Sequence, residues 1–221
     1  MNARKTEHAV DPIFTNRWSP RSFGPEEIPR EVLLQCFEAA RWAPSSTNQQ
    51  PWRFLYARKN SPRFPLFVEM IVERNRMWAR HAAAIVFFLS KKIAVVGPQI
   101  RESKTHSFDC GAAWQNFALQ ASLLGWHTHA MGGFDRENAP KRFGVPDDIW
   151  QFNCVAAIGK IGSKEHLEVI DPRFAAREAP NGRVPLDMLL MEDEFKPGLT
   201  DFPVGTPGAP VIPTEWEPPR K

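Results

Sequence analysis

The spacing of apolar residues along the chain predicts helices interspersed with short strands. Apolar residues recur every three or four positions in the segments expected to be helical, which are 29–42, 65–80, 107–124 and 136–143. Short runs rich in apolar residues predict strands at 52–57, 82–90, 128–134 and 152–160. These elements lack the regular spacing of a doubly wound fold. We therefore expect an α+β protein, with helices flanking a mixed, mainly antiparallel sheet.

Two of these elements are mostly apolar and carry few or no charges. The run at 82–90 has no charged residue, which is typical of a central strand buried on both faces. The segment at 107–124 carries apolar residues on nearly every side, so we expect it to be buried on most sides. Either a central place in a monomer or packing against a second subunit explains such a helix. Between the two elements, 91–105 is basic and irregular, which predicts a flexible loop.

The bulk properties describe an ordinary globular protein. A chain of 221 residues can hold one ample core, so one domain is the first expectation. Its hydrophobic content of 43% and charged content of 24% are unremarkable for a globular protein. The net charge of +3 is small, and no block of Lys and Arg with interleaved aromatic residues occurs. Both features argue against a nucleic-acid partner.

The ends of the sequence bear on location and domain organisation. The first ten residues are polar and lack the apolar stretch of a signal peptide. The longest strongly apolar run is too short to cross a bilayer. We therefore expect a soluble, cytoplasmic protein without a membrane partner. Proline and glycine dominate the last residues, so we predict a single domain over 1–195 and a Pro-rich C-terminal arm over 196–221.

Several kinds of chemical site find no support in the sequence. Cys36, Cys110 and Cys154 lie far apart among apolar neighbours, which predicts buried, inert thiols rather than a disulfide framework or a zinc site. His127 and His129 form a His-x-His pair, but a metal site needs further ligands and none is apparent, so we predict no metal. The chain has no Gly-x-Ser-x-Gly, Gly-x-Gly-x-x-Gly or P-loop motif.

An early segment has the composition of an anion site. Arg17, Ser19 and Arg21 occupy alternate positions, and alternate residues of an extended segment point the same way. The proline at position 20 favours extended geometry for the residue before it. Two guanidinium groups and a hydroxyl suit a phosphate, because arginine offers a planar fork of donors. A solvated basic surface strand explains the same residues without a ligand.

A second segment has the composition of a polar turn that contacts a ligand. Pro44 follows a helical run and ends it. The Ser and Thr residues at 45–47 favour a turn. Asn48 and Gln50 each carry both a donor and an acceptor, and such amides match the alternating groups along the pyrimidine edge of a flavin. A polar turn that caps a helix explains the hydroxyls alone, but it does not explain two amides and a Trp within five positions.

These segments resemble the FMN-dependent nitroreductase family. The family pattern Arg-x-Ser-x-Arg-x-Phe appears at 17–23, and Ala-Pro-Ser-x-x-Asn-x-Gln-Pro-Trp appears at 43–52. The shorter patterns Asn-x-x-Trp, Asp-x-Gly-x-Ala and Met-Gly-Gly-Phe follow at 75–78, 109–113 and 131–134. The similarity runs from about residue 11 to residue 190 in the family's order. The Pro-rich end lies outside it.

The resemblance implies a three-layer α/β/α fold, an interlocked homodimer and an FMN site at the subunit interface. Arg17, Ser19, Arg21 and the late Arg183 correspond to phosphate-contacting residues, although Trp18 stands where the family more often has another Arg. The implied cofactor-binding residues are Arg17, Trp18, Ser19, Arg21, Pro44, Ser45, Ser46, Asn48, Gln50, Asn75, Met131, Gly132, Gly133 and Arg183. No side chain is expected to be catalytic, since the cofactor carries the hydride chemistry.

The implied activity is that of an NAD(P)H-dependent nitroreductase or quinone reductase. The flavin takes a hydride from NADH or NADPH and then reduces a flat acceptor, such as a nitroaromatic or a quinone, in a ping-pong cycle. We expect the choice of acceptor to lie in 91–107 and in aromatic residues of the partner subunit. Three alternatives stay open: a flavin carrier or sensor without turnover, a reductive dehalogenase and a basic interaction module without a cofactor. The sequence chooses neither NADH nor NADPH.

Overall fold

The computed structural model describes residues 4–194 of the chain. The chain divides into two compact units, of which the larger is Pro12–Ala179 and the other combines the two terminal segments. The predicted arm over 196–221 lies outside the described residues, so its boundary at residue 195 stays a prediction. All elements discussed below belong to the larger unit unless stated otherwise.

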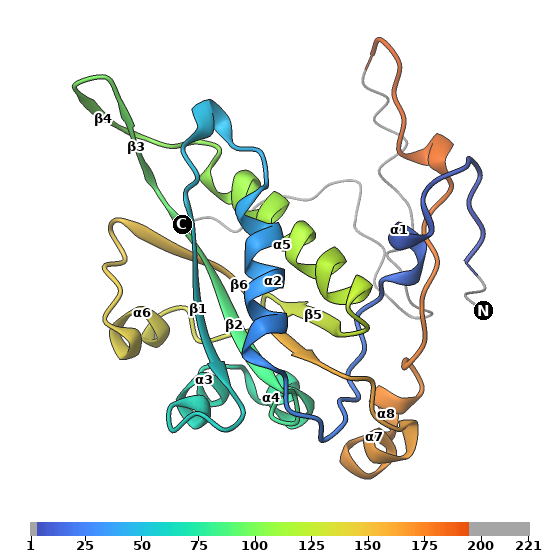
Figure 1. Cartoon of the computed structure of the whole chain (residues 1–221). Helices are drawn as coiled ribbons and strands as arrows, with labels where there is room; N and C mark the ends of the chain where they lie inside the picture. Colours follow the sequence, from blue (N-terminus) through green and yellow to red (C-terminus); the bar gives the residue numbers. More distant parts are fainter. Residues whose placement is uncertain (1–3, 195–221) are drawn as a thin grey trace, which may run out of the picture. The chain divides into compact units, whose positions relative to one another are not determined.

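One antiparallel sheet of four strands forms the centre of the larger unit (Figure 1). The strand order is β1-β2-β6-β5, with β1 at Trp52–Arg58, β2 at Ala84–Lys91, β6 at Trp150–Gly159 and β5 at His127–Met131. The three neighbouring pairs are all antiparallel. This agrees with the mainly antiparallel sheet expected from the sequence, and no parallel pair occurs among the described strands. The four strands fall where the apolar runs predict them.

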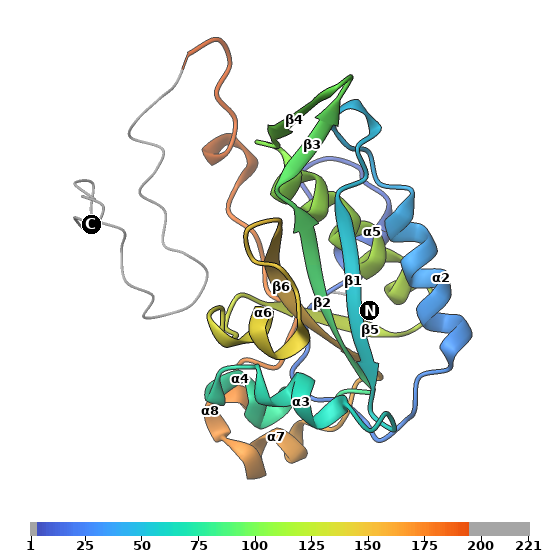
Figure 2. The ribbon, with the colours of Figure 1, turned by 90° about the vertical axis from the view of Figure 1, so that its left-hand side faces the viewer.

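Helices cover both faces of this sheet (Figure 2). α2 (Arg30–Arg41) and α5 (His106–Leu123) pack on one face. Five shorter helices lie on the other face, namely α3 (Phe64–Glu69), α4 (Glu73–Ala79), α6 (Asn138–Phe143), α7 (Lys164–Ile170) and α8 (Pro172–Ala175). Alternate residues of β2 serve the two layers, because successive side chains of a strand point to opposite faces. Val86 and Phe88 join the core under α2 and α5, whereas Phe87 and Leu89 join the opposite core. The three-layer α/β/α arrangement is thus confirmed.

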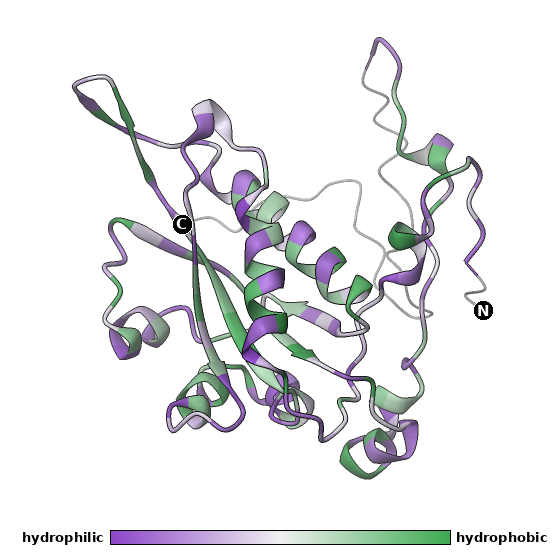
Figure 3. Cartoon of the chain, viewed as in Figure 1, coloured by the Kyte–Doolittle hydropathy of each residue, from purple (hydrophilic) through white to green (hydrophobic). Residues whose placement is uncertain are grey.

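Hydropathy explains why β2 is central. Its residues from Ala84 to Ser90 are all buried, and Figure 3 shows most of the strand as hydrophobic. α2 instead alternates between polar and apolar turns, and its buried residues are Leu33, Cys36 and Ala40. That spacing gives a one-sided helix with its other side in solvent.

The prediction of one helix at 65–80 is wrong in one respect, because the segment forms two helices. α3 spans Phe64–Glu69 and α4 spans Glu73–Ala79. Ile71 forms an isolated antiparallel bridge with Phe134, and the N–H of Val72 donates to the carbonyl of Gly133 at 3.2 Å. The backbone between the two helices therefore bonds to the chain after β5, so it cannot continue a helix.

The prediction of a flexible loop at 91–105 is also wrong, because most of this segment forms two strands. β3 (Ile93–Val96) and β4 (Gln99–Glu102) pair as an antiparallel hairpin. The two residues between them include Gly97 at φ 59°, and a glycine in the first central position fits a tight hairpin turn. The run Ile-Ala-Val-Val has high strand propensity. The flanking basic residues obscured this signal in the sequence.

The remaining elements are short. α6 (Asn138–Phe143) confirms a predicted helix, whereas α1 (Pro12–Asn16), α7 (Lys164–Ile170) and α8 (Pro172–Ala175) were not predicted. Two 3-10 turns occur among the described residues: η1 spans Ser46–Asn48 in the larger unit, and η2 spans Leu186–Met188 in the smaller one. Among the described residues, no helix has the length and apolar character needed to cross a membrane.

Candidate functional site

The anion-site segment 17–21 lies beside β5. Arg17 Nη1 donates to Ser19 Oγ at 3.4 Å, so two of the three predicted phosphate contacts do come together. The ring of Trp18 lies 6.4 Å from that of His127 at the start of β5. Arg17, Trp18, Ser19 and Arg21 are all half-buried. The segment is therefore a docked part of the unit and not a freely solvated strand.

Two side chains outside the motif fix its backbone. The N–H of Arg21 donates to both carboxylate oxygens of Glu178 at 2.9 and 3.0 Å, and the N–H of Ser22 donates to one of them at 2.8 Å. On the other side, His129 Nδ1 lies 2.9 Å from the carbonyl oxygen of Pro20. These bonds hold the backbone between the two arginines. No sequence pattern pointed to Glu178, because it is 157 residues away from Arg21.

His129 is a neutral hydrogen-bond donor in this arrangement. Burial lowers its pKa to about 4, with smaller lowering contributions from Arg21 and Arg17, while the carbonyls of Pro20 and Ser19 act in the opposite direction. The ring is therefore uncharged near neutral pH. Since its partner is a carbonyl oxygen, Nδ1 must carry the proton. The His129 ring also packs on Trp78, with centroids 4.6 Å apart.

The guanidinium of Arg21 is partly desolvated and lies near other cations as well as Glu178. Burial lowers its pKa, Glu178 raises it, and Arg177 and Arg74 lower it further. Arginine stays protonated even so. Arg74 belongs to α4, one residue before the predicted site residue Asn75. It adds a cation near the segment that the sequence motifs did not identify.

The glycine pair after β5 meets α4. A Cβ on Gly133 would lie 2.8 Å from Val72 Cγ2 and 2.9 Å from Asn75 Nδ2, so only glycine fits there. A Cβ on Gly132 would approach nothing nearer than Arg136 Nη2 at 3.9 Å. Gly132 thus has open space beside it, while Gly133 is a packing residue. Met131, the last residue of β5, is buried.

The polar turn at 44–50 has a strained backbone. Thr47, Asn48 and Gln50 have φ values of 49°, 55° and 48°, in the left-handed region that non-glycine residues rarely adopt. Ser45 holds the turn closed, because its Oγ accepts from the N–H of Gln50 at 3.0 Å and its carbonyl accepts from that of Asn48 at 3.0 Å. Such strain gathers at functional sites. The turn is therefore held in a specific shape.

This turn projects into solvent from the start of α5. The N–H of Ser46 donates to Asp109 Oδ2 at 3.3 Å, in the first turn of that helix. Gln49 Nε2 donates to the carbonyl of Val95 in the hairpin at 3.1 Å. The other predicted contacts of the turn, Pro44, Asn48 and Gln50, are exposed, and Ser45 is half-buried.

The two predicted groups lie at opposite ends of α5 within one chain (Figure 1). Ser46 of the polar turn bonds to Asp109 at the start of the helix. Trp18 instead contacts His127 of β5, shortly after the helix ends. α5 has 18 residues, so it is about 27 Å long at the usual rise. A single chain therefore does not bring the turn and the arginine segment onto one small ligand.

One side of α5 exposes large apolar residues, with the polar Gln115 among them. Phe108 and Leu123 are 82% and 66% exposed, Gly111 has open space beside it and Leu119 is half-buried. These four residues define what we call the α5 stripe. They recur at intervals that place them on one side of a helix. Large exposed apolar side chains grouped on one face mark interaction surfaces.

Arg183 belongs to the smaller unit. Its Nη1 donates to the carbonyl of Gly182 at 2.8 Å, and its proposed contact with a phosphate stays a prediction. The three cysteines are free thiols, and burial raises the pKa of each to about 12. Over residues 4–194, no cluster of three or more metal-ligating side chains is found.

Comparison with known proteins identifies the family. The family model described as "Nitroreductase family" matches residues 14–160, which is more than half of the chain. The protein therefore belongs to the nitroreductase family. The match includes both predicted segments and the glycine pair, and it excludes Arg183.

Named relatives and solved structures agree with this assignment. The chain is 28% identical over 178 residues to the "Putative NADH dehydrogenase/NAD(P)H nitroreductase" of Archaeoglobus fulgidus, covering 76% of this chain and 94% of that protein. It is 25% identical to the "Putative NAD(P)H nitroreductase YdgI" of Bacillus subtilis, covering 67% and 86%. A crystal structure described as an oxidoreductase containing FMN superposes with a TM-score of 0.84 at 42% identity, covering 89% of this chain and 98% of that one.

Proposed function

We propose that this protein is an FMN-dependent oxidoreductase that takes a hydride from NADH or NADPH and reduces a flat acceptor, such as a nitroaromatic or a quinone, by a ping-pong cycle. The observation that carries the proposal is the docked segment in which Arg17 and Ser19 meet while Glu178 and His129 fix the backbone at Arg21. The names of similar proteins and structures, which refer to NAD(P)H and to FMN, support the same activity.

The residues present fit FMN at both of its ends. Arg17, Ser19 and Arg21 would hold the phosphate, because two cations and a hydroxyl lie on one segment. The open space beside Gly132 would admit the edge of a flat ring close to the backbone. Asn75 lies against Gly133 and would offer its amide at the same place. Arg183 remains a further candidate for the phosphate.

A complete site requires two copies of the chain. Ser45, Ser46, Asn48 and Gln50 of one copy would reach the ribityl chain and ring edge of the cofactor held by the other copy. Two facts support this homodimer: the two groups lie at opposite ends of α5, and the α5 stripe is apolar and uncovered. The same surface supports packing against a second subunit for 107–124, one of the two explanations that the sequence leaves open.

The chain's own residues position the reaction and stabilise charge. When bound, FMN supplies the hydride chemistry, accepting two electrons from the nicotinamide and passing them to the acceptor. Backbone and amide donors near Gly132 and Asn75 would stabilise negative charge on the ring, because fixed dipoles need no reorganisation as charge develops. No described side chain is assigned a catalytic role. A cytoplasmic location stays a prediction.

An absorption spectrum of the purified protein, followed by anaerobic titration with NADH and with NADPH, tests the proposal. We expect a yellow protein whose flavin band bleaches with at least one nicotinamide and returns when a nitroaromatic or a quinone is added. A yellow protein that neither nicotinamide bleaches would favour a carrier or sensor. A protein that stays colourless with added FMN would favour the basic interaction module. Dehalogenase activity is tested with an iodinated phenol as acceptor.

A further inference from the structure

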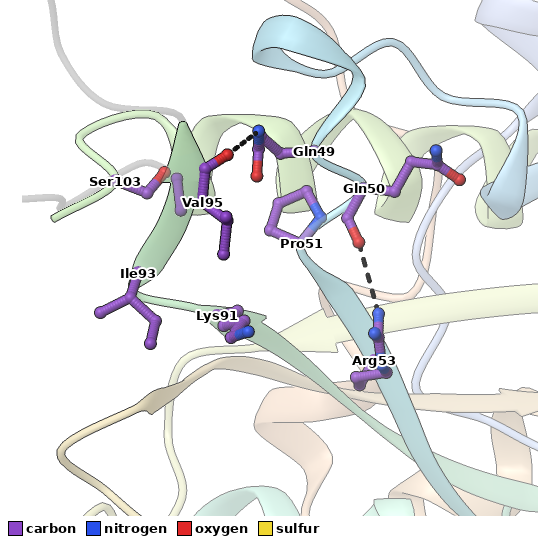
Figure 4. Close-up of a pocket in the computed structure, with 9 residues that line it drawn as sticks. Gln49, Gln50, Pro51, Arg53, Lys91, Ile93, Val95 and Ser103 are labelled. Carbon is purple, nitrogen blue, oxygen red and sulfur yellow. Dashed lines mark hydrogen bonds between the residues drawn. The ribbon is translucent and has the colours of Figure 1, made fainter. Parts of the chain in front are cut away.

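A small cavity lies between the polar turn and the base of the hairpin (Figure 4). Its volume is about 110 Å³, several times the space needed for one water molecule. Gln49 and Arg53 line one side, and Lys91, Val95 and Ser103 line the other. The cavity thus has room for a group of the size of a carboxylate or a phosphate, but not for a whole cofactor.

The cavity is cationic and contains no acid. Arg53 and Lys91 both line it, and none of its lining residues is Asp or Glu. Across residues 4–194, neither cation forms a salt bridge. The hydroxyl of Ser103 adds a donor beside the two charges, whereas the amide nitrogen of Gln49 already donates to Val95 and Thr47. A concave place lined by charge of one sign concentrates ligands of the opposite sign.

Arg53 is held in place before any ligand binds. Its Nη1 donates to the carbonyl oxygen of Trp52 at 2.6 Å and to that of Gln50 at 3.3 Å, and Figure 4 draws the second bond. Its guanidinium also lies 5.4 Å from the centre of the Trp150 ring. A tethered arginine loses less conformational freedom on binding than a solvated one. This distinguishes the cavity from an ordinary basic surface, where side chains are free.

The cavity adjoins the turn assigned to the flavin edge. Gln49 and Gln50 belong to that turn, and Gln49 also bonds to Val95 of the hairpin. The hairpin contributes aliphatic side chains at Ile93 and Val95 to the same wall. The place therefore combines an apolar wall with two cations beside the proposed ring site. A flat molecule that carries one acidic group matches this combination.

We propose that this cavity binds the oxyanion of a substrate, a carboxylate or a phosphate, and so makes the enzyme prefer acidic substrates over neutral ones of the same shape. This inference rests on the proposed function for the position of the reacting ring, whereas the anion site itself rests on the geometry of the cavity. Two substrates carry such an oxyanion: an acidic electron acceptor, and NADPH through its 2′-phosphate. Lys91 and Arg53 are specificity-determining residues in this assignment, not catalytic ones.

The test compares matched pairs of substrates in the variant Lys91→Met. The acceptor pair is 4-nitrobenzoate and 4-nitrobenzamide, and the donor pair is NADPH and NADH. We expect the preference for the acidic member of one pair, measured as the ratio of kcat/KM values, to fall by roughly threefold to tenfold. The pair that responds identifies the source of the oxyanion. The wild-type preference should also weaken as salt is added, because the charges are partly exposed.

Two control variants separate this role from a general effect. Lys92→Met removes the neighbouring charge, whose ammonium donates to the carbonyl of Asp147 and does not line the cavity, so both ratios should stay at the wild-type value. Lys91→Arg should retain the preference. An equal loss for acidic and neutral substrates, or unchanged ratios in both pairs, would overturn the assignment. Flavin content and thermal melting check that each variant is folded.

A binding experiment keeps the test independent of turnover. Calorimetry with benzoate and with benzamide on the purified protein should show tighter binding of benzoate, and Lys91→Met should abolish the difference. If no nicotinamide bleaches the protein, the proposed function fails but this measurement still decides the anion site. If bleaching occurs and benzoate binds no better than benzamide to the wild type, and both kinetic ratios are unchanged in the variant, the anion site fails alone.

Discussion

The segment 17–21 and the turn 44–50 carry the two halves of the proposed cofactor site, and their surroundings differ. The segment is half-buried, and its backbone is fixed by Glu178 and His129 from distant parts of the chain. The turn is largely exposed and takes its shape from local bonds through Ser45. Its long-range contacts are single hydrogen bonds to Asp109 and to the hairpin.

This difference shows what one chain can prepare by itself. The arginine segment has its geometry from tertiary contacts within the larger unit, so a phosphate site can exist in a single copy. The turn has its strained geometry from local hydrogen bonds through Ser45, and the ligand that we assign to it belongs to another copy. We infer that phosphate affinity is a property of one chain, whereas complete FMN binding depends on association.

The largest expected effect comes from charging the α5 stripe. Phe108→Glu with Leu123→Glu would bury two carboxylates without partners, which costs roughly 3 kcal/mol or more. We therefore expect the dimer dissociation constant to rise by more than about a hundredfold, since each 1.4 kcal/mol is a factor of ten. Analytical ultracentrifugation measures this change, and FMN content should fall in parallel.

Val169→Glu is the matched control for this variant. Val169 is 88% exposed on α7, away from the α5 stripe, so the same change there should leave both the dimer and its flavin intact. A doubly charged variant that stays dimeric and fully loaded with FMN would show that α5 is not the interface. It would also remove the distinction between the two halves of the site.

The second effect, of similar order, comes from neutralising the docked segment. Arg17→Gln with Arg21→Gln removes two charge-assisted contacts, each worth about 1.5–3 kcal/mol. We expect FMN affinity to fall by roughly a hundredfold or more, as measured by titrating apoprotein with FMN and following the flavin fluorescence. Arg41→Gln is a control, since Arg41 is exposed and pairs with Glu38 on α2. Unchanged affinity in the double variant would reject the phosphate assignment.

The sequence predicts the sheet better than it predicts the site. β2 is recognisable because 84–89 is apolar without interruption, and these residues are indeed buried. The break between α3 and α4 is not recognisable, because it depends on a bridge from Ile71 to Phe134, far along the chain. Local patterns carry burial and propensity, but they carry no information about which distant backbone a segment will meet.

The same limit applies to the candidate site. The motifs at 17–23 and 43–52 locate both halves, yet they do not reveal that the halves lie at opposite ends of one helix. Glu178, His129 and Arg74 were missed because each acts on the segment through space, at Arg21 or Pro20. Their residue types are common on any surface. They gain a role only because β5, α4 and the residues after α8 pack around the segment.

A third prediction concerns pH and is specific to the docked half. Burial holds the pKa of His129 near 4, against 6.5 for the free side chain. Between these values the unfolded chain binds a proton that the folded chain does not, so the free energy of unfolding falls as pH falls from 6.5 towards 4. The contribution of His129 to this loss is at most about 3 kcal/mol. Urea unfolding at several pH values measures it.

His129→Gln isolates this contribution. The variant should be less stable at pH 7, because the bond to Pro20 is disturbed, but its stability should depend less steeply on pH between 6 and 4.5. Part of the pH dependence of stability should remain in both proteins. It comes from His81, His106 and His127, whose pKa values are also lowered mainly by burial. An identical slope in wild type and variant would mean that His129 is not buried as a neutral ring.

The smallest expected effect tests the strain in the turn. Thr47 has φ 49°, and a β-branched residue is poorly suited to this left-handed conformation. Asn adopts it more readily because its side chain bonds to the local backbone. Thr47→Asn should therefore raise the free energy of unfolding by about 0.5–1 kcal/mol, measured by urea unfolding of the apoprotein.

Thr6→Asn is the control for this variant. Thr6 is exposed and has no positive φ, so the change there should alter the free energy of unfolding little. A Thr47→Asn protein that is no more stable than wild type would mean that the turn is unstrained without its ligand. Its shape would then be acquired on association and not prepared within the chain.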